Sequence, residues 1–221
     1  MARSQIIKDL AVGKKDVFTA LKILKVILSD LDLPAIASWV EHELSGYSLE
    51  DQFPDYRAVK GIIMGSFWVG YMQYKNLPMP LSQVDTDIVE ELSSIRIPQS
   101  IKAIADILLQ DDKDIKFTRI LPSNAYPFFM RGTNIDGIIT LETVLDKSAL
   151  PNVLAAVENR LLDTFILLEK KLGNLDELDF SIDEIQQEEL RRQIQNIIFN
   201  DNSIKIGDNN RIDSSTIKTG I

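Results

Sequence analysis

Two groups of side chains in this sequence have the chemical types and spacing to bind a ligand. The first combines an indole, a carboxylate, two phenols and a guanidinium, at Trp39, Glu43, Tyr47, Tyr56 and Arg57. The second places two carboxylates and a guanidinium on one predicted helix, at Glu158, Arg160 and Asp163. An arginine among aromatic rings can stack on a planar group or hold an anion. These are our candidate binding residues, and the sequence names no catalytic residue.

The first group also has a structural interpretation, which we favour. Trp39 can belong to the hydrophobic core, and Tyr47 can pack over the end of the helix that carries Trp39. Arg57 can then pair with Glu43, because an arginine and a carboxylate satisfy each other when both leave water. In that interpretation the group stabilises the fold and binds nothing.

The second group has a structural interpretation as well. Residues three apart share a helix face, so Arg160 and Asp163 can form a surface ion pair of little energetic value. Alternatively, this pair can reach across to Tyr56 or Arg57 and fix the long helix to the sheet. We favour a structural role over a ligand site here too.

The composition of the chain excludes several classes of functional site. The chain has 221 residues, 45% hydrophobic and 26% charged, which is typical of one globular domain or one domain with a small appendage. Its 24 basic and 33 acidic residues give a net charge of −9, which argues against general nucleic-acid binding because phosphate is repelled. The absence of cysteine excludes disulfides, thiolate catalysis and cysteine-based zinc sites. One histidine, His42, excludes multi-histidine metal sites, and we expect it to be an exposed or half-exposed residue without a special role.

No pattern in the sequence predicts a metal or a cofactor. Acidic residues gather at Asp85 and Asp87 and again at 111–114, but both clusters flank predicted helices. Carboxylates at helix ends ordinarily serve as caps or as solvated loop charges. The sequence also has no phosphate-binding loop, dinucleotide fingerprint or nucleophile elbow. We therefore expect neither a metal nor a cofactor.

Nothing in the sequence predicts export or membrane insertion. Polar residues interrupt each apolar run at the N-terminus, whereas a signal peptide needs a continuous apolar stretch. The most apolar window, residues 61–72, is shorter than the roughly 20 residues that span a bilayer. The expectation is a cytoplasmic protein without a transmembrane segment.

Hydrophobic periodicity predicts an α+β fold of amphipathic helices packed on a small antiparallel sheet. Apolar residues at three- and four-residue spacing predict helices at 4–13, 16–30, 34–46, 85–97, 101–109, 151–173 and 185–199. β-Branched and aromatic residues predict two strands within 56–72 and one strand each at 115–121 and 137–144. The prolines of residues 77–80 exclude a central strand there and require a loop or a sheet edge.

The last residues of the sequence combine a turn sequence with regularly placed isoleucines. Gly-Asp-Asn-Asn at 207–210 favours a turn, and isoleucines lie on both sides of it, at Ile204, Ile206, Ile212 and Ile217. The pattern predicts a β-hairpin or a single β-solenoid-like rung, which cannot bury its isoleucines alone. The same tail of another subunit would supply the missing contacts, so we expect a homo-oligomer assembled through these residues. The alternative is a frayed tail.

Six short strings carry a family resemblance. They are WVEHELSGY at 39–47, PDYR at 54–57, GSF at 65–67, YKNLPMP at 74–80, QSI at 99–101 and VENRLLD at 157–163. In their order and spacing they resemble the AbiTii domain, a module of bacterial abortive-infection and other conflict systems. Val69 and Thr164 depart from that pattern, which favours a polar and an aromatic residue at these positions.

The resemblance covers residues 1–172. The chain then divides into this α+β domain, an acidic linker with an amphipathic helix at 173–200, and the Ile- and Asn-rich tail at 201–221. The resemblance implies a role in phage defence, as a growth-arresting effector or a module attached to one, and implies no reaction.

We favour a module that acts by binding a protein partner or by self-assembly. One alternative is a toxin-type enzyme acting on nucleic acid or nucleotide, with a cleft formed by Tyr56, Arg57, Glu158, Arg160 and Asp163. A weaker alternative is a membrane-disrupting effector that uses residues 61–72.

Overall fold

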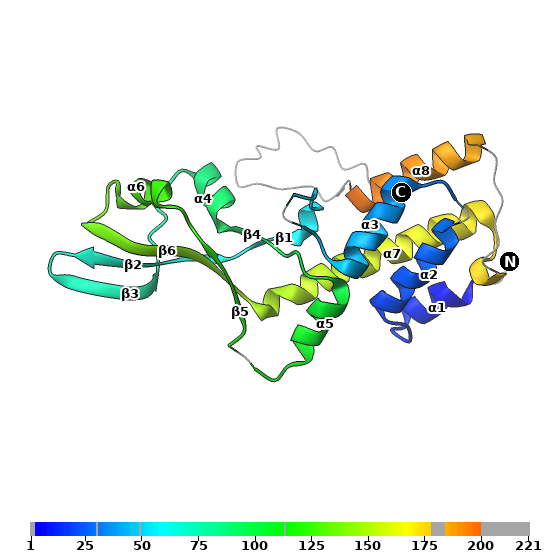
Figure 1. Ribbon diagram of the computed structural model, residues 1–221, viewed down its shortest axis with the longest axis horizontal. Helices are drawn as coiled ribbons and strands as arrows, with labels where there is room; N and C mark the ends of the chain where they lie inside the picture. The colour runs from blue at the N-terminus through cyan, green and yellow to red at the C-terminus, as the bar shows by residue number, and fades with distance from the viewer. Residues whose placement is uncertain (1–2, 30, 49, 113, 178–183, 200–221) are drawn as a thin grey trace, which may run out of the picture.

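Most of the helices gather at one end of an elongated molecule, and the main sheet lies at the other with the short helices at 86–93 and 126–130 (Figure 1). The computed structural model describes residues 3–29, 31–48, 50–112, 114–177 and 184–199. The helices are α1 (Gln5–Ala11), α2 (Val17–Ser29), α3 (Pro34–Ser45), α4 (Thr86–Ser93), α5 (Ile101–Leu109), α6 (Tyr126–Met130), α7 (Leu150–Leu172) and α8 (Glu184–Phe199). The strands are β1 (Ala58–Lys60), β2 (Ile62–Val69), β3 (Met72–Pro78), β4 (Ser94–Arg96), β5 (Lys116–Ile120) and β6 (Gly137–Asp146). The α+β class predicted from the sequence is confirmed.

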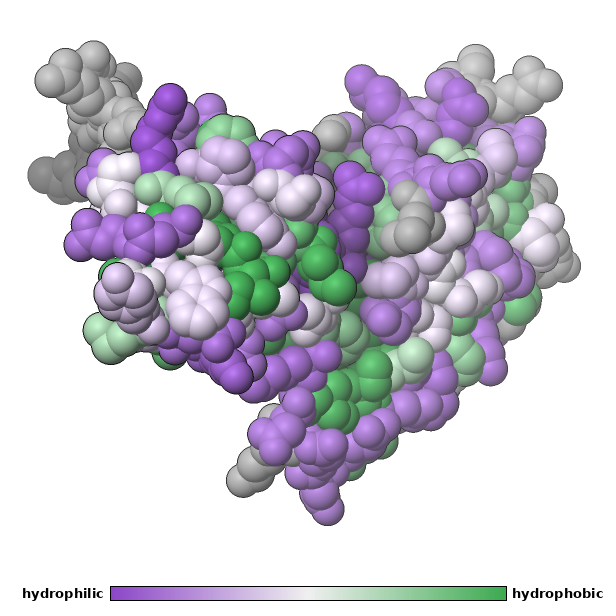
Figure 2. All heavy atoms as spheres, turned by 60° about the vertical axis from the view of Figure 1, so that its left-hand side comes forward, coloured by the Kyte–Doolittle hydropathy of each residue, from purple (hydrophilic) through white to green (hydrophobic). Residues whose placement is uncertain are grey.

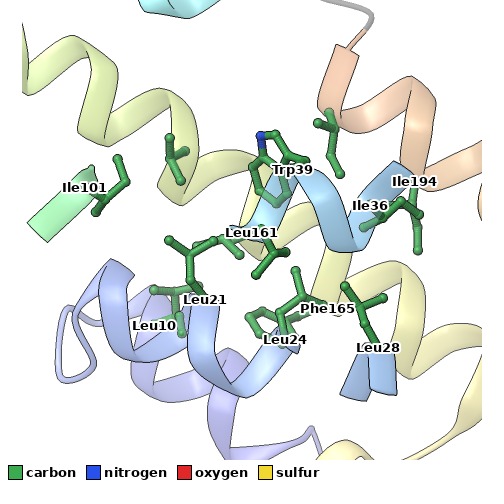
Figure 3. Close-up of a cluster of buried hydrophobic side chains, with 14 of the residues drawn as sticks. Leu10, Leu21, Leu24, Leu28, Ile36, Trp39, Ile101, Leu161, Phe165 and Ile194 are labelled. Atoms are coloured by element: carbon green, nitrogen blue, oxygen red, sulfur yellow. The ribbon is translucent and has the colours of Figure 1, made fainter. Parts of the chain in front are cut away.

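The long helix α7 forms the centre of the helical end. Apolar side chains recur along it at three- and four-residue spacing and are fully buried, at Val153, Val157, Leu161, Phe165 and Leu168. Helices α1, α2, α5 and α8 contact α7, and α3 packs on α2, α5 and α8. Figure 3 shows how side chains from these helices meet in one core. Helix α8 belongs to this core through Leu190, Ile194 and Ile198.

The sheet at the other end has the strand order β3-β2-β6-β5, and all its neighbours are antiparallel. Strands β2 and β3 form a hairpin whose turn contains Gly70 at φ 57°, a backbone conformation that favours glycine. Strand β3 lies at the edge of the sheet and ends at Pro78, as the prolines of this segment require. The strands predicted at 115–121 and 137–144 are confirmed as β5 and β6.

The two faces of this sheet have different surroundings. One face carries Ile63 and Phe67 of β2 and Leu141 of β6, which are buried in a second hydrophobic core. Phe129 of α6 is fully buried in the same core and covers this face. The opposite face leaves apolar side chains exposed, among them Ile62 and Ile120.

A short pairing of β1 with β4 lies between the two ends of the molecule (Figure 1). The sequence predicted one helix from 85 to 97, and this prediction is wrong in its last part. Helix α4 ends at Ser93, and Ile95 lies in β4, where it is 6% exposed. An apolar residue at the right helical spacing also fits a short strand, and pairing with β1 decides between the two.

Two further expectations concern particular segments. Residues 61–72 contain β2 and the hairpin turn, and none of the helices in the described ranges has the length and apolar character to cross a membrane. The tail predicted to pair at 201–221, with Ile204, Ile206, Ile212 and Ile217, lies outside the described residues.

Candidate functional site: a buried polar network beside helix α3

Helix α3 supplies the first two members of the network. Trp39 and Glu43 are four residues apart, share the inward face of the helix and are 2% and 0% exposed. In Figure 3 the Trp39 ring lies among the apolar side chains of the core with its indole nitrogen turned away from them. The sequence interpretation of Trp39 as a core residue is confirmed.

The chain turns sharply after α3 at Gly46. Its φ is 97°, and a side chain there would place a Cβ 2.9 Å from the carbonyl oxygen of Pro98. The next residue, Tyr47, donates its backbone N–H to the same carbonyl at 2.8 Å. Glycine is therefore required for this close approach, which brings Tyr47 over the end of α3.

Arg57 enters the network from the short 3-10 turn before β1. Its guanidinium and the Glu43 carboxylate form an ion pair in which both side chains are 0% exposed. The same guanidinium donates through one terminal nitrogen to the carbonyls of Ile97, at 3.1 Å, and Gln99, at 2.6 Å. The predicted pairing of Arg57 with Glu43 is confirmed, and it connects α3 to the segment that follows β4.

Two tyrosines complete the coordination of the carboxylate. The hydroxyls of Tyr47 and Tyr56 donate to Oε1 of Glu43, at 2.7 and 2.6 Å, and the Trp39 indole donates to the Tyr56 oxygen at 2.7 Å. Burial raises the pKa of both phenols above the ordinary 10.0, and the negative charge of Glu43 raises each pKa further. Both tyrosines therefore remain neutral hydrogen-bond donors at physiological pH.

Arg160 touches the edge of this network from α7. Its guanidinium carbon lies 4.3 Å from the centroid of the Tyr56 ring, a cation–π contact. It also donates to the carbonyls of Ala156, on its own helix, and Ile198, at the end of α8, each at 3.0 Å. Arg160 thus connects the long helix to Tyr56. This agrees with the interpretation in which Arg160 reaches across to Tyr56 or Arg57, and not with a surface pair to Asp163.

The other two members of the second group lie apart from these contacts. Asp163 is exposed, and Glu158 is half-buried. Arg160 is engaged with Tyr56 and with backbone carbonyls, and within the described ranges it forms no ion pair with Asp163. The structure therefore brings Arg57, Tyr56 and Arg160 together and leaves the two carboxylates of α7 outside the network.

A shallow groove of about 200 Å³ adjoins the network on its solvent side. It is lined by Ala35, Ser38, Trp39, His42, Tyr47, Gln52, Pro54 and Phe199. His42 is 33% exposed, as expected, with its Nε2 3.6 Å from the Asp51 carboxylate and its ring 5.0 Å from that of Tyr47. An aromatic wall with one imidazole could hold a small flat group.

No metal site is formed by three or more histidine, aspartate or glutamate residues in the described part of the chain. The acidic loop at 111–114 contains a local hydrogen bond instead, from the backbone N–H of Asp114 to the Asp112 carboxylate at 2.9 Å. Asp85 precedes α4 without a side-chain cap bond. These groups have the surroundings of ordinary loop carboxylates.

Sequence reasoning missed the partners that close the network from a distance. The carbonyls of Ile97 and Gln99 lie 40 and 42 residues from Arg57 along the chain, and Phe199 reaches the groove from the far end of α8. Backbone carbonyls carry no residue-specific signal, so composition and spacing could not indicate them. The only local signal was Pro98, which ends regular structure at this point.

One comparison with known proteins identifies a family. A family model described as AbiTii matches residues 3–193, which includes the helical core and most of α8. No curated protein and no solved structure gives a significant match. Because the model covers most of the sequence, the chain belongs to the AbiTii family.

Proposed function

We propose that this chain is an anti-phage module of abortive infection that acts in the cytoplasm by contact, with a protein partner or with further copies of itself. The family name supports the abortive-infection role. The observation that supports contact over turnover is the state of Glu43 and Arg57. Both are 0% exposed and bonded to each other, so a ligand could reach neither without opening the network. The proposed domain boundary at residue 172 is not needed for this role, since α8 packs on the same core.

The experiment separates contact from catalysis through the accessible acids of α7. Cells that express the full chain would be challenged with phage, and survival would be compared with cells that express the double variant Glu158→Gln, Asp163→Asn. These substitutions keep size and polarity but remove the only carboxylates of the second group. Contact through the C-terminal tail, without these two acids, predicts unchanged protection and an unchanged melting temperature. Loss of protection in a folded double variant would contradict it.

A toxin-type enzyme acting on nucleic acid or nucleotide remains the second candidate, and the groove beside α3 favours it. His42 is half-exposed there, beside Asp51 and an aromatic wall, which is a plausible base for proton transfer. The substitution His42→Gln tests it, because glutamine retains a polar group but cannot exchange a proton near neutral pH. A folded His42→Gln variant that loses growth arrest would support the enzyme, and full retention would count against it.

Assembly through the C-terminal tail is a separate part of the proposal. It rests on Ile204, Ile206, Ile212 and Ile217, whose regular spacing around a turn favours pairing with the same segment of another copy. This part depends on the sequence alone.

A further inference from the structure

A cleft of about 780 Å³ lies where strand β4 meets strand β5 of the four-stranded sheet, and we call it the junction cleft. Its volume is within the range of roughly 300–1,000 Å³ that is usual for small-molecule sites. Figure 2 shows the outline of the molecule dipping between its two ends, with mainly hydrophilic residues around the dip. The polar side chains that line the junction cleft come from α4, β4 and β5 and are Glu90, Glu91, Ser94, Arg96, Thr118 and Arg119.

Arg119 reaches the junction cleft from β5 and is only partly paired. One terminal nitrogen of its guanidinium, Nη2, donates to the carbonyls of Glu91 and Leu92 at the end of α4, at 3.0 and 2.7 Å. These bonds fix the orientation of the group. Its Nε is buried without a hydrogen-bond partner, and its Nη1 makes no hydrogen bond to any residue in the described ranges. Because a buried donor without a partner costs free energy, this guanidinium has donors left for an acceptor from outside the chain.

Arg96 lines the same cleft from β4, and its side chain makes no hydrogen bond or ion pair within the described part of the chain. Its guanidinium carbon lies 5.5 Å from the centroid of the Phe53 ring, a contact that orients the group and leaves its N–H donors unused. Burial lowers the pKa of Arg119, Glu91 opposes this, and the positive charge of Arg96 lowers the pKa further. Two cations therefore face one cleft and repel each other. An anion bound between them would replace this repulsion by attraction.

Two hydroxyl groups add to the donors of the junction cleft. Ser94 lies in β4 and Thr118 in β5, and neither side chain makes a hydrogen bond to another residue that the structure describes. Guanidinium and hydroxyl groups are the side-chain donors that phosphate oxygens commonly accept from. The donor set on these two strands is therefore of the kind that binds a phosphate group.

Two carboxylates on the α4 wall limit how much negative charge the cleft can accept. Glu90 is paired with Lys60, with 2.9 Å between Nζ and Oε1. With that lysine included, the three cations Lys60, Arg96 and Arg119 exceed the two carboxylates by one charge. This balance fits one phosphate group and opposes a long polyanion, in agreement with the net charge of −9. Glu91 can accept hydrogen bonds from hydroxyl groups beside the phosphate, as carboxylates do from the hydroxyls of a sugar.

We propose that the junction cleft binds the phosphate group of a phosphorylated sugar, either free or as part of a nucleotide. Arg96 and Arg119 bind the phosphate, and Ser94 and Thr118 donate their hydroxyls to it. Glu91 accepts from the hydroxyls of the sugar. Because the phosphate donors come from both β4 and β5, a bound ligand fixes the β1–β4 pair to the main sheet. This site goes beyond the proposed function, since it requires neither the contact mechanism nor the C-terminal tail.

The test is isothermal titration calorimetry of the full chain with ribose 5-phosphate and with AMP, at constant ionic strength. Ribose and adenosine, which lack the phosphate, are the matched ligands. We expect saturable binding of a phosphorylated ligand, a higher melting temperature in its presence, and no binding of ribose or adenosine. Tighter binding of ribose 5-phosphate would assign the cleft to a free sugar phosphate, and tighter binding of AMP would assign it to a nucleotide.

Three variants locate the ligand. Arg96→Gln changes an exposed side chain, so its melting temperature without ligand should be unchanged, and it should weaken binding about tenfold because a charged partner of the phosphate is lost. The matched control is Arg131→Gln, which removes an exposed arginine outside the cleft and should bind as the unmodified chain does. Glu91→Ala should lower the preference for ribose 5-phosphate over inorganic phosphate, because the acceptor for the sugar hydroxyls is lost.

Each outcome decides the inference. Weakened binding in Arg96→Gln together with full binding in Arg131→Gln would establish the site. Equal binding in both variants would place the phosphate elsewhere and overturn it, and so would the absence of saturable binding to either phosphorylated ligand at millimolar concentration. Equal affinity of the unmodified chain for inorganic phosphate and for ribose 5-phosphate would overturn the assignment of a sugar. Phage protection is not a readout here, so the proposed function stands or fails separately.

Discussion

The polar network beside α3 and the outward face of the four-stranded sheet differ in burial from what their residue types suggest. Charged residues are buried in the first, and apolar residues are exposed on the second. The network holds charged and aromatic residues of the types suited to chemistry, and it buries the charged pair Glu43 and Arg57 at 0% exposure. The sheet face opposite α6, which we call the open face, instead leaves isoleucines in solvent, with Ile62 at 62% and Ile120 at 81% exposure. Accessibility, and not residue type, therefore decides which region can meet a partner. One buried ion pair thus lies inside the helical end, and a few apolar side chains of the sheet remain in solvent.

The largest expected effect is on stability, when the network loses its cation. Arg57→Ala leaves the Glu43 carboxylate buried without its counter-charge, which typically costs about 3–5 kcal/mol of unfolding free energy. Denaturant unfolding followed by circular dichroism measures this loss. The matched control is Lys102→Ala, which removes a cation of an exposed pair on α5 and should cost under about 1 kcal/mol.

The opposite result would break the comparison between the two regions. If Arg57→Ala unfolds at the same denaturant concentration as the unmodified chain but abolishes phage protection, Arg57 binds a ligand. The network would then be a functional site that opens in solution.

The tail truncation has the next largest expected effect, on assembly. Deleting residues 200–221 removes Ile204, Ile206, Ile212 and Ile217, so the mass measured by light scattering should fall if these residues pair between copies. An unchanged mass after truncation would remove the tail from the proposal.

Much of the helical end could be predicted from the sequence, because its information is local. Leu161, Phe165 and Leu168 recur at four- and three-residue spacing, and this pattern alone indicates a helix with one buried face. The pairing of Arg57 with Glu43 was also foreseeable, since a buried cation needs a nearby anion. These predictions needed no knowledge of which distant segments meet.

The sheet end was less predictable because its surroundings depend on topology. Ile62 and Ile63 are adjacent and both apolar, yet one is 62% exposed and the other 2%. The pattern cannot say which face α6 covers, since that depends on how a later segment crosses the sheet. Ile95 was assigned to a helix for the same reason, because its partner strand β1 lies more than thirty residues earlier.

High pH should reduce the stability that the network gives to the fold. The pKa of Tyr47 and of Tyr56 is raised in the folded chain above the ordinary 10.0, mainly by burial and also by Glu43. The folded state therefore holds these protons more tightly than the unfolded state, and stability is fully present below pH 10.0 and falls as the pH rises above it. Denaturant unfolding at increasing alkaline pH measures this slope. Tyr56→Phe should make it shallower, and an unchanged slope would mean that Tyr56 is not buried against the carboxylate.

A smaller loss of stability is expected when the contact between α7 and the network is removed. Arg160→Ala removes the cation over the Tyr56 ring and the hydrogen bond to the Ile198 carbonyl, which together should cost about 1–2 kcal/mol. Hydrogen exchange at the end of α8 should rise, because that carbonyl contact fixes it. Arg160→Lys separates the two contributions, since lysine keeps the charge but loses the planar donor group. Equal exchange in all three proteins would show that α8 is fixed by its apolar residues alone.

The smallest effect on stability should come from the open face, and it completes the comparison. Ile120 is 81% exposed, so Ile120→Asp removes almost no buried surface and should change the unfolding free energy of the monomer by under about 0.5 kcal/mol. Denaturant unfolding at low protein concentration measures this change. A large loss of stability would mean that Ile120 is buried in solution and that the open face is covered by another part of the fold.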